Sequence, residues 1–138
     1  MTKSTLKAHA HCVFRMYYHI VFVTKFRHKA LSEDILIRLK EHFERLCNNA
    51  GCELAEFNGD ADHVHLLVDA NPKIAPSKLV NTLKTISSRE IRKEFAEHLK
   101  PFYWKPFLWS RAYCIVSAGG APLDVLKQYI ENQGKEPS

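Results

Sequence analysis

The chain has 138 residues, of which 46% are hydrophobic and 25% are charged. This composition is ordinary for a globular protein and excludes disordered and fibrous classes. Lys and Arg number 20 against 15 Asp and Glu, which gives a formal net charge of +5. Such a surplus favours an anionic partner, most commonly nucleic acid. The length predicts one domain over residues 1–138.

The sequence contains no sign of export or of membrane insertion. No apolar stretch approaches the ~20 residues that a bilayer crossing needs, and residues 1–11 form a polar leader without an apolar secretory segment. The four cysteines include no Cys-x-x-Cys pair and show no disulfide-framework spacing. They are interpreted as small core residues in a reducing compartment. We therefore expect a cytoplasmic protein with no membrane partner.

The first predicted elements are a strand and a helix. A run of apolar and aromatic residues over positions 12–24 predicts a long strand, and a basic loop over residues 25–29 follows it. Ser32 is a typical helix-capping residue, and the two acidic residues after it suit the first turn of a helix. Apolar residues then recur at helical spacing until Gly51, where we expect the helix to end.

A β-hairpin is predicted next. Residues 53–57 form its first strand, and Asn58-Gly59 is a dipeptide typical of a hairpin turn. Residues 62–69, with the sequence Asp-His-Val-His-Leu-Leu-Val-Asp, form the partner strand. Asn71-Pro72 ends this strand, because proline cannot continue the ladder of hydrogen bonds.

The second half of the chain predicts a long helix, a strand and a last helix. The long helix begins near Pro76 and buries apolar residues as far as Leu99. Three residues at four-residue spacing form an exposed stripe on it: Lys84, Ser88 and Arg92. Residues 111–116 predict a fourth strand, and residues 122–134 predict the last helix, with a proline near its start and a glycine at its end.

This order, β-α-β-β-α-β with an added C-terminal helix, predicts an α+β ferredoxin-like sandwich in which two helices pack on one face of an antiparallel sheet. Side chains of a strand alternate between faces, so His63 and His65 project together while Val64 and Leu66 point the other way. If these apolar residues meet the helices, the histidines occupy the open face. Two imidazoles on one side of a strand can hold a metal ion, although such a pair also occurs incidentally.

The last helix offers a second half of a site. Tyr129 and Gln133 are i and i+4, so they share one helix face. Laid on the open side of the sheet, this face would bring a phenol nucleophile and an amide oxygen to the histidine pair. His63, His65 and Gln133 would then form a three-ligand site suited to Mg²⁺ or Mn²⁺ on a phosphate substrate. The alternative is that Tyr129 is an ordinary half-buried helix tyrosine.

Other residues near the histidine pair have open interpretations. Asp62 either orients a histidine or caps the hairpin turn. His19 points to the open face of the first strand, where a hydrogen-bonded sheet histidine is the default interpretation. A second pair, His9-Ala10-His11, lies in the polar leader, where no rigid element fixes it, and we assign it no role.

Together these motifs resemble the single-tyrosine HUH transposases of small bacterial and archaeal insertion sequences, to which REP-associated tyrosine transposases are more distant relatives. The family is named for its His-hydrophobe-His strand, matched here within residues 62–67. The similarity continues in four further motifs: Lys25-Phe26-Arg27-His28, Leu83-Lys84-Thr85-Ile86-Ser87-Ser88-Arg89, Leu108-Trp109-Ser110-Arg111-Ala112-Tyr113-Cys114 and Tyr129-Ile130-Glu131-Asn132-Gln133. Ala61 is a departure, since many members carry proline there, but it alters a turn and not a catalytic group.

The resemblance implies a transposase that binds hairpin-bearing single-stranded DNA ends, cleaves them and rejoins them. It assigns the nucleophile to Tyr129 and the ligands of Mg²⁺ or Mn²⁺ to His63, His65 and Gln133. Attack of the tyrosine on a phosphate would leave a 5′-phosphotyrosine link and a free 3′-hydroxyl. Because this exchange approximately conserves the bond energy, rejoining would need no ATP or other nucleotide cofactor.

The resemblance also implies partners. Members are homodimers whose sheets join edge to edge and whose tyrosine helix can complete the partner's site. Five basic residues are candidates for contacts with the hairpin backbone, or else are solvated surface charges: Lys25, Arg27, Lys84, Arg89 and Arg92. Three aromatic residues are candidates for stacking on unpaired bases, or else belong to the core: Phe26, Trp104 and Trp109. Two other functions stay open, a domesticated relative that processes palindromic repeats and a non-catalytic module that binds single-stranded nucleic acid.

Overall fold

The computed structural model describes residues 8–9, 12–13, 16–117 and 130–132. Tyr129, Gln133 and most of the predicted last helix lie outside these residues. In chain order the elements are β1 (Ala8–His9), β2 (Cys12–Val13), β3 (Tyr17–Thr24), the 3-10 turn η2 (Lys25–Arg27), α1 (Glu33–Asn49), β4 (Glu53–Gly59), β5 (His63–Asp69), α2 (Pro76–Glu94), α3 (Ala96–Leu99) and β6 (Trp109–Ser117).

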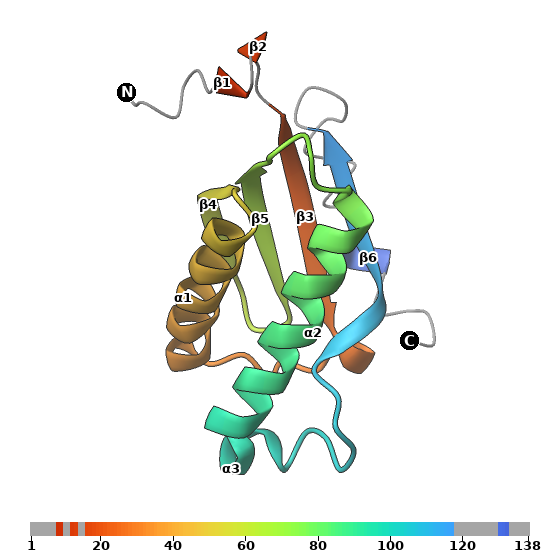
Figure 1. The fold of residues 1–138 in the computed structure, drawn as a ribbon. Coiled ribbons are helices and arrows are strands. Elements are labelled where there is room, and N and C mark those ends of the chain that lie inside the picture. The colour runs from red at the N-terminus through yellow and green to blue at the C-terminus, as the bar shows by residue number, and fades with distance from the viewer. Residues whose placement is uncertain (1–7, 10–11, 14–15, 118–129, 133–138) are drawn as a thin grey trace.

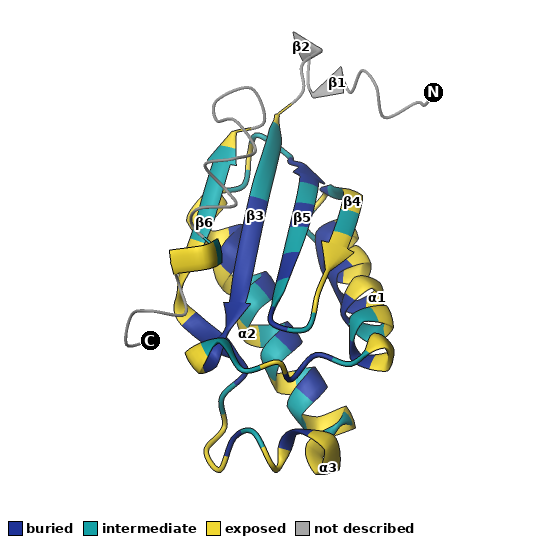
Figure 2. Cartoon of the chain, turned by 180° about the vertical axis from the view of Figure 1, so that it is seen from behind, coloured by how far each residue is buried: buried dark blue, intermediate teal, exposed yellow. Residues whose placement is uncertain are grey.

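The centre of the fold is a four-stranded antiparallel sheet with the order β4-β5-β3-β6. Helices α1 and α2 both cover one of its faces (Figure 1), and Figure 2 shows the sheet from behind. This is the α+β sandwich with the β-α-β-β-α-β order that the sequence predicts, so the predicted fold class is confirmed. Within the residues that the structure describes, no helix is long and apolar enough to cross a membrane.

The main core lies between the sheet and the two helices. The strands contribute Ile20 and Phe22 from β3 and Leu66 from β5, which pack with Phe43 of α1 and Leu83 of α2. All five of these side chains are fully buried, and each such side chain contributes roughly 1.5–3 kcal/mol when it is removed from water. Because this core occupies the helix-covered face of the sheet, the side chains on the opposite face do not belong to it.

Ser32 and Gly51 mark the two ends of helix α1. The Ser32 hydroxyl accepts a hydrogen bond from the Ile35 amide at 3.2 Å, which satisfies a backbone donor of the first turn. At the other end Gly51 has a φ of 74°, a left-handed conformation that glycine adopts without a steric penalty. Both signals are readable in the sequence, and the predicted helix is confirmed.

The predicted strand over residues 12–24 is wrong in its first half. Strand β3 begins at Tyr17, and Cys12–Val13 pairs instead with Ala8–His9 in a separate two-stranded sheet. Tyr17 is paired with Asp69, the last residue of β5, and of the described residues before Tyr17 none belongs to a strand of the main sheet. The hydrophobic run predicted an extended chain, but only the length of the neighbouring strand decides where pairing stops.

The predicted hairpin turn at Asn58-Gly59 is also wrong. Both residues belong to β4, and Gly59 is paired with Val64. The turn comes one step later and is closed by a hydrogen bond from the Asp60 amide to the His63 carbonyl at 2.9 Å. Gly59 has a packing role, since a Cβ there would lie 2.5 Å from Leu36 Cδ2. The glycine therefore allows α1 to approach the strand closely.

The second helix is interrupted before Leu99. Helix α2 ends at Glu94, and Phe95, with φ −123° and ψ 37°, separates it from the short helix α3. Leu99 is buried in α3, so the break directs this side chain into the core. The fourth strand begins two residues earlier than predicted, because Trp109 pairs with Thr24 beyond an irregularity in β3.

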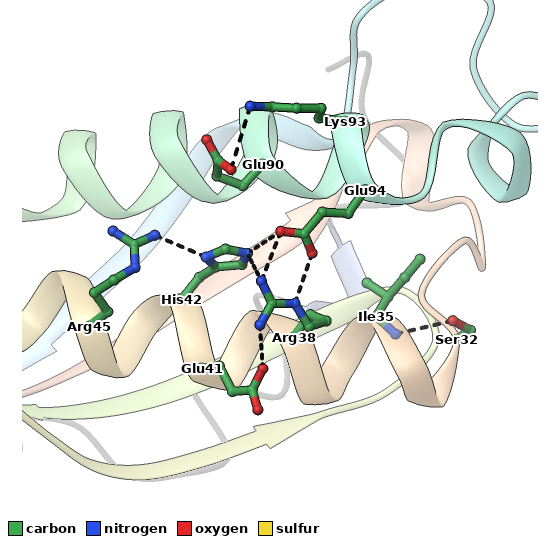
Figure 3. Close-up of polar contacts among 9 residues, drawn as sticks. All are labelled: Ser32, Ile35, Arg38, Glu41, His42, Arg45, Glu90, Lys93 and Glu94. Atoms are coloured by element: carbon green, nitrogen blue, oxygen red, sulfur yellow. Dashed lines mark hydrogen bonds and ion pairs between the residues drawn. The ribbon is translucent and has the colours of Figure 1, made fainter.

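Helices α1 and α2 are also joined by a polar network (Figure 3). Arg38 donates from Nε and Nη2 to the two carboxylate oxygens of Glu94 at 2.8 and 2.9 Å, and it also contacts Glu41. His42 is buried and lies 3.0 Å from Glu94 through Nε2, while Arg45 donates to its Nδ1 at 2.9 Å. Arg38 Nη2 also lies 3.2 Å from His42 Nε2, so Arg38 and His42 meet at the same carboxylate oxygen of Glu94.

We expect Glu94→Gln to lower stability most at neutral pH and less in acid. The hydrogen bonds from Arg38 lower the pKa of Glu94 to about 2, against an opposing effect of burial and with a further contribution from His42. A carboxylate whose pKa is depressed in the folded state stabilises the fold above the unfolded pKa near 4.5, and this contribution is lost as the pH falls towards 2. Because Glu94 is exposed, screening limits its contribution to about 1 kcal/mol.

Urea unfolding at pH 7 and at pH 3 measures this contribution. The difference between wild type and Glu94→Gln should be largest at pH 7 and should shrink at pH 3. The control is Glu44→Gln, at an exposed position of α1, which we expect to change stability little at either pH. An equal loss for Glu94→Gln at both pH values would show that the carboxylate charge is not what stabilises the helix pair.

Candidate active site on the open face of the sheet

The two histidines of the His-x-His motif lie on the face of the sheet opposite α1 and α2. Along β5, Val64 and Leu66 are fully buried in the main core, whereas His63 and His65 are half-buried. Successive side chains of a strand point to opposite faces, so the histidines belong to the face seen in Figure 2. This is the placement that strand alternation predicts.

A third histidine joins this face from β3. In the register of the sheet Val21 lies opposite His65, and His19 lies opposite Leu67, so all four side chains share one face. His19 Nδ1 lies 2.8 Å from His65 Nε2, and the two rings stack with their centroids 4.9 Å apart. Burial lowers the pKa of His65, as do His19 and, less strongly, His63, against an opposing effect of Glu56. His65 is therefore held in its neutral form, the form that binds metals.

His63 is held by the residue that precedes it. Its Nδ1 lies 2.9 Å from Asp62 Oδ1, and the other carboxylate oxygen of Asp62 accepts a hydrogen bond from Arg27 Nε, also at 2.9 Å. Burial raises the pKa of Asp62, but the hydrogen bonds from His63 and Arg27 outweigh it and leave the pKa below its usual value. Asp62 is therefore a charged acceptor that fixes His63 Nδ1 as the protonated nitrogen and leaves Nε2 available. The interpretation of Asp62 as an orienting group is the one that the geometry supports.

One turn of helix, residues 130–132, lies against this face. Ile130 packs on Val21 and Val23 of β3 in a small second apolar cluster, separate from the main core. The carbonyl oxygen of Glu131 accepts a hydrogen bond from Arg27 Nη1 at 2.9 Å. The described part of the predicted tyrosine helix is thus attached to the open face, on the same chain. Tyr129 and Gln133 adjoin it in the sequence, and both lie outside the described residues.

The donor set on this face fits a divalent metal only in part. Two imidazoles are good ligands, and the bond between Asp62 and His63 is the kind of support that orients a metal-binding histidine. Among the described residues, however, no group of three or more His, Cys, Asp or Glu side chains could hold an ion. The histidine pair therefore suits a site that takes a further ligand from another segment.

Comparison with known proteins identifies the family. Residues 12–133 match the family model described as IS200-like transposase. The chain belongs to this transposase family. It is 31% identical over 121 residues to the ISDra2 transposase TnpA of Deinococcus radiodurans, covering 88% of this chain and 86% of that protein. It is 29% identical over 130 residues to the transposase of insertion sequence IS200 from Salmonella typhimurium, covering 94% and 84%.

The fold of this transposase is similar to that of a solved structure. A crystal structure of a Deinococcus radiodurans protein superimposes with a TM-score of 0.83 at 31% sequence identity. The match covers 92% of this chain and 97% of that chain. The family assignment makes the protein a transposase, an enzyme class that moves DNA segments, and so agrees with the sequence-based identification.

The basic residues predicted to contact DNA do not form one open patch in the transposase. Lys25 is 7% exposed, with Nζ 5.3 Å from the centre of the Phe26 ring and 5.0 Å from that of Phe107. Arg27 is engaged by Asp62 and Glu131, as described above. Both residues are therefore held by the protein, in contrast to the freely solvated loop that their sequence suggests.

The stripe on α2 is half-buried, which corrects the prediction that it is exposed. Lys84 Nζ donates to the Arg111 carbonyl of β6 at 2.7 Å, and burial lowers its pKa, with smaller effects of Lys25 and Arg111. Arg92 Nε bonds Ser88 Oγ at 3.1 Å. The stripe is half-buried because the chain before β6 lies alongside α2, and the two segments line a groove between them. Arg89, with 60% of its side chain exposed, stays accessible.

Of the three aromatic candidates for stacking on bases, two are exposed and one is buried. Trp104 is 86% exposed and Phe26 is 51% exposed, so both rings are accessible. Trp109 is 7% exposed, lies in the main core, and donates from Nε1 to Ser87 Oγ at 3.0 Å. Trp109 is therefore a structural residue of the core, which is the alternative that its sequence position left open.

Proposed function

We propose that this transposase binds hairpin-bearing single-stranded DNA ends and cleaves and rejoins them through a 5′-phosphotyrosine intermediate on Tyr129. The observation that carries the proposal is the chain of contacts across the open face. Arg27 bonds both the Asp62 carboxylate, which orients His63, and the carbonyl of Glu131. The HUH histidines and the segment that follows Tyr129 in the sequence are thus tied to the same side chain.

His63, His65 and Gln133 are the proposed ligands of Mg²⁺ or Mn²⁺. Such an ion would withdraw charge from a non-bridging phosphate oxygen. The chain prepares two of the ligands: Asp62 keeps the proton of His63 on Nδ1, and the depressed pKa of His65 keeps that ring neutral. His65 Nε2 is shared with His19, so coordination through this atom would replace their hydrogen bond. Gln133 would supply the further ligand that the histidine pair lacks.

The proposed reaction is a phosphoryl transfer that balances without a co-reactant. The Tyr129 oxygen forms a bond to the scissile phosphorus, and the bond from phosphorus to the 3′-oxygen breaks. The phenol loses one proton, and the departing 3′-oxygen gains one to become the 3′-hydroxyl. An unperturbed tyrosine has a pKa near 10, so its deprotonation needs local assistance. The reverse step, attack by a 3′-hydroxyl on the phosphotyrosine, rejoins the DNA with no ATP.

The proposed partners are the DNA hairpin and a second copy of the chain. The net charge of +5 favours a polyanion, and Arg89, Phe26 and Trp104 are the exposed residues among the candidates for DNA contacts. In the described part of the sheet, β4 and β6 are the edge strands. Unpaired edges can add a strand of another chain, so a homodimer with joined sheets is the assembly we expect, with a mass measurable by light scattering.

Incubation of the protein with single-stranded DNA that carries a hairpin end tests the proposal. With Mg²⁺ we expect a protein–DNA conjugate on a denaturing gel, containing the strand 3′ of the cut, together with a released strand ending in a 3′-hydroxyl. Chelation of the metal should abolish both products. Tight hairpin binding with no conjugate under any divalent ion would favour a non-catalytic nucleic-acid-binding module instead.

A further inference from the structure

Arg27 connects three segments that are distant in the sequence. It lies just after β3, its Nε bonds Asp62 Oδ2 at the start of β5, and its Nη1 bonds the main-chain carbonyl of Glu131. These partners are 35 and 104 residues away from it. A guanidinium has several donors in a fixed planar arrangement, so one side chain can hold two acceptors at once.

The backbone around Arg27 is strained in a way that serves these contacts. Phe26 and Arg27 have φ angles of 59° and 55°, the left-handed region that non-glycine residues adopt at a cost of roughly 1–2 kcal/mol each. Hydrogen bonds on both sides hold the turn: Lys25 N donates to the Leu108 carbonyl at 2.8 Å, and Thr24 Oγ1 donates to the His28 carbonyl at 2.7 Å. Strain that the surrounding structure maintains at this point indicates a functional constraint on where Arg27 lies.

We propose that Arg27 is a positioning residue that aligns the segment after Tyr129 with the HUH histidines, and that it is not a contact to the DNA backbone. The proposal rests on the proposed function, because it deepens the account of that site. One side of the guanidinium fixes the Asp62 carboxylate and, through it, His63. The other side fixes the Glu131 carbonyl and, through it, the turn that Ile130 packs against β3. Loss of Arg27 should therefore slow the chemical step and leave DNA affinity nearly intact.

The exposure of the residue agrees with this role. Arg27 has 29% of its side chain exposed, and its Asp62 partner has 12% exposed. The Asp62 carboxylate is occupied on both oxygens, since Oδ2 accepts from Arg27 Nε and Oδ1 lies 2.9 Å from His63 Nδ1. A phosphate brought to Arg27 would therefore meet a guanidinium already paired with a carboxylate, whereas Lys29 in the same loop is exposed to solvent.

Arg27→Gln and the matched control Lys29→Gln, which removes one charge from the same loop, separate the two roles. For Arg27→Gln we expect conjugate formation at saturating DNA to slow by about 10–100-fold, as for other residues that orient a site. Its hairpin affinity, and the salt dependence of that affinity, should stay equal to those of Lys29→Gln. Arg27→Lys keeps the charge but not the planar arrangement of donors, so it should remain slow.

Hydrogen exchange gives a readout that needs neither activity nor metal. The peptide containing residues 130–132 should exchange faster in Arg27→Gln than in the wild type and in Lys29→Gln. The proposal is overturned if Arg27→Gln reacts at the wild-type rate at saturating DNA while the slope of log hairpin affinity against log salt concentration falls in magnitude by about one. It is also overturned if hydrogen exchange in this peptide is unchanged. If the wild type forms no conjugate at all, the proposed function fails, and the exchange result still decides whether Arg27 fixes this segment.

Discussion

Tyr129→Phe is expected to abolish the covalent protein–DNA conjugate completely while hairpin binding stays within about twofold of the wild type. The substitution removes one oxygen atom, and without it no phosphotyrosine ester can form. The ring and its apolar surface remain, so a packing role of Tyr129 would be largely preserved. The measurement is a denaturing gel with labelled single-stranded DNA, alongside a binding titration at fixed salt.

The matched control for this prediction is Tyr113→Phe. Tyr113 lies in β6 and is 37% exposed, with its ring 5.7 Å from Lys84 Nζ. It is paired with Phe22, whose side chain belongs to the main core, so Tyr113 points to the helix-covered side. This variant should form the conjugate at the wild-type rate. A conjugate of undiminished yield in Tyr129→Phe would remove Tyr129 from its proposed role.

His63→Ala is expected to reduce metal-dependent conjugate formation by at least about 100-fold. Removal of residues that merely orient a metal ligand typically costs 10–100-fold, and loss of a ligand itself should cost no less. The variant also leaves the Asp62 carboxylate without its partner on one side, although Arg27 still neutralises it. Hairpin affinity should be retained, because His63 is half-buried on the open face and carries no fixed charge.

The control for His63→Ala is His98→Gln. His98 is an exposed histidine of α3 whose Nε2 bonds the Ala30 carbonyl at 2.8 Å. Its replacement should change the rate by less than about twofold, as is usual for substitutions away from a site. Titration of Mn²⁺ in place of Mg²⁺ adds a second readout, since a weakened site should need more metal. Equal rates for His63→Ala and the wild type at low metal concentration would contradict a metal-binding role of this histidine.

The fold could be predicted from local patterns because each pattern has a direct physical cause. Ser32 and Gly51 bound α1 since a cap and a left-handed residue are needed at those ends. Boundaries that depend on a neighbour were predicted less well. Strand β3 stops pairing where β5 ends, and the hairpin turn falls after Gly59, which pairs with Val64 and leaves room for Leu36.

Sequence spacing could not reveal which basic residues are engaged by the protein. Lys25, Lys84 and Arg27 all look like solvated charges in the printed sequence, and each is held by partners in the folded chain. His19 shows a partial signal, since alternation with Val21 and Val23 places the three on one face. Its contact with His65, 46 positions away in the chain, depends on the register between β3 and β5, which the sequence does not reveal.

The transposase family, the antiparallel sandwich and the common face of His63 and His65 could all be predicted from the amino-acid sequence alone. Alternation along a strand and periodicity along a helix are local properties, so they survive without any knowledge of the neighbours. Three contacts became visible in the folded chain: Asp62 orients His63, His19 stacks on His65, and Arg27 joins the site to residues 130–132. Those contacts depend on strand register and on a left-handed turn at Phe26 and Arg27, which arise when distant segments pack together.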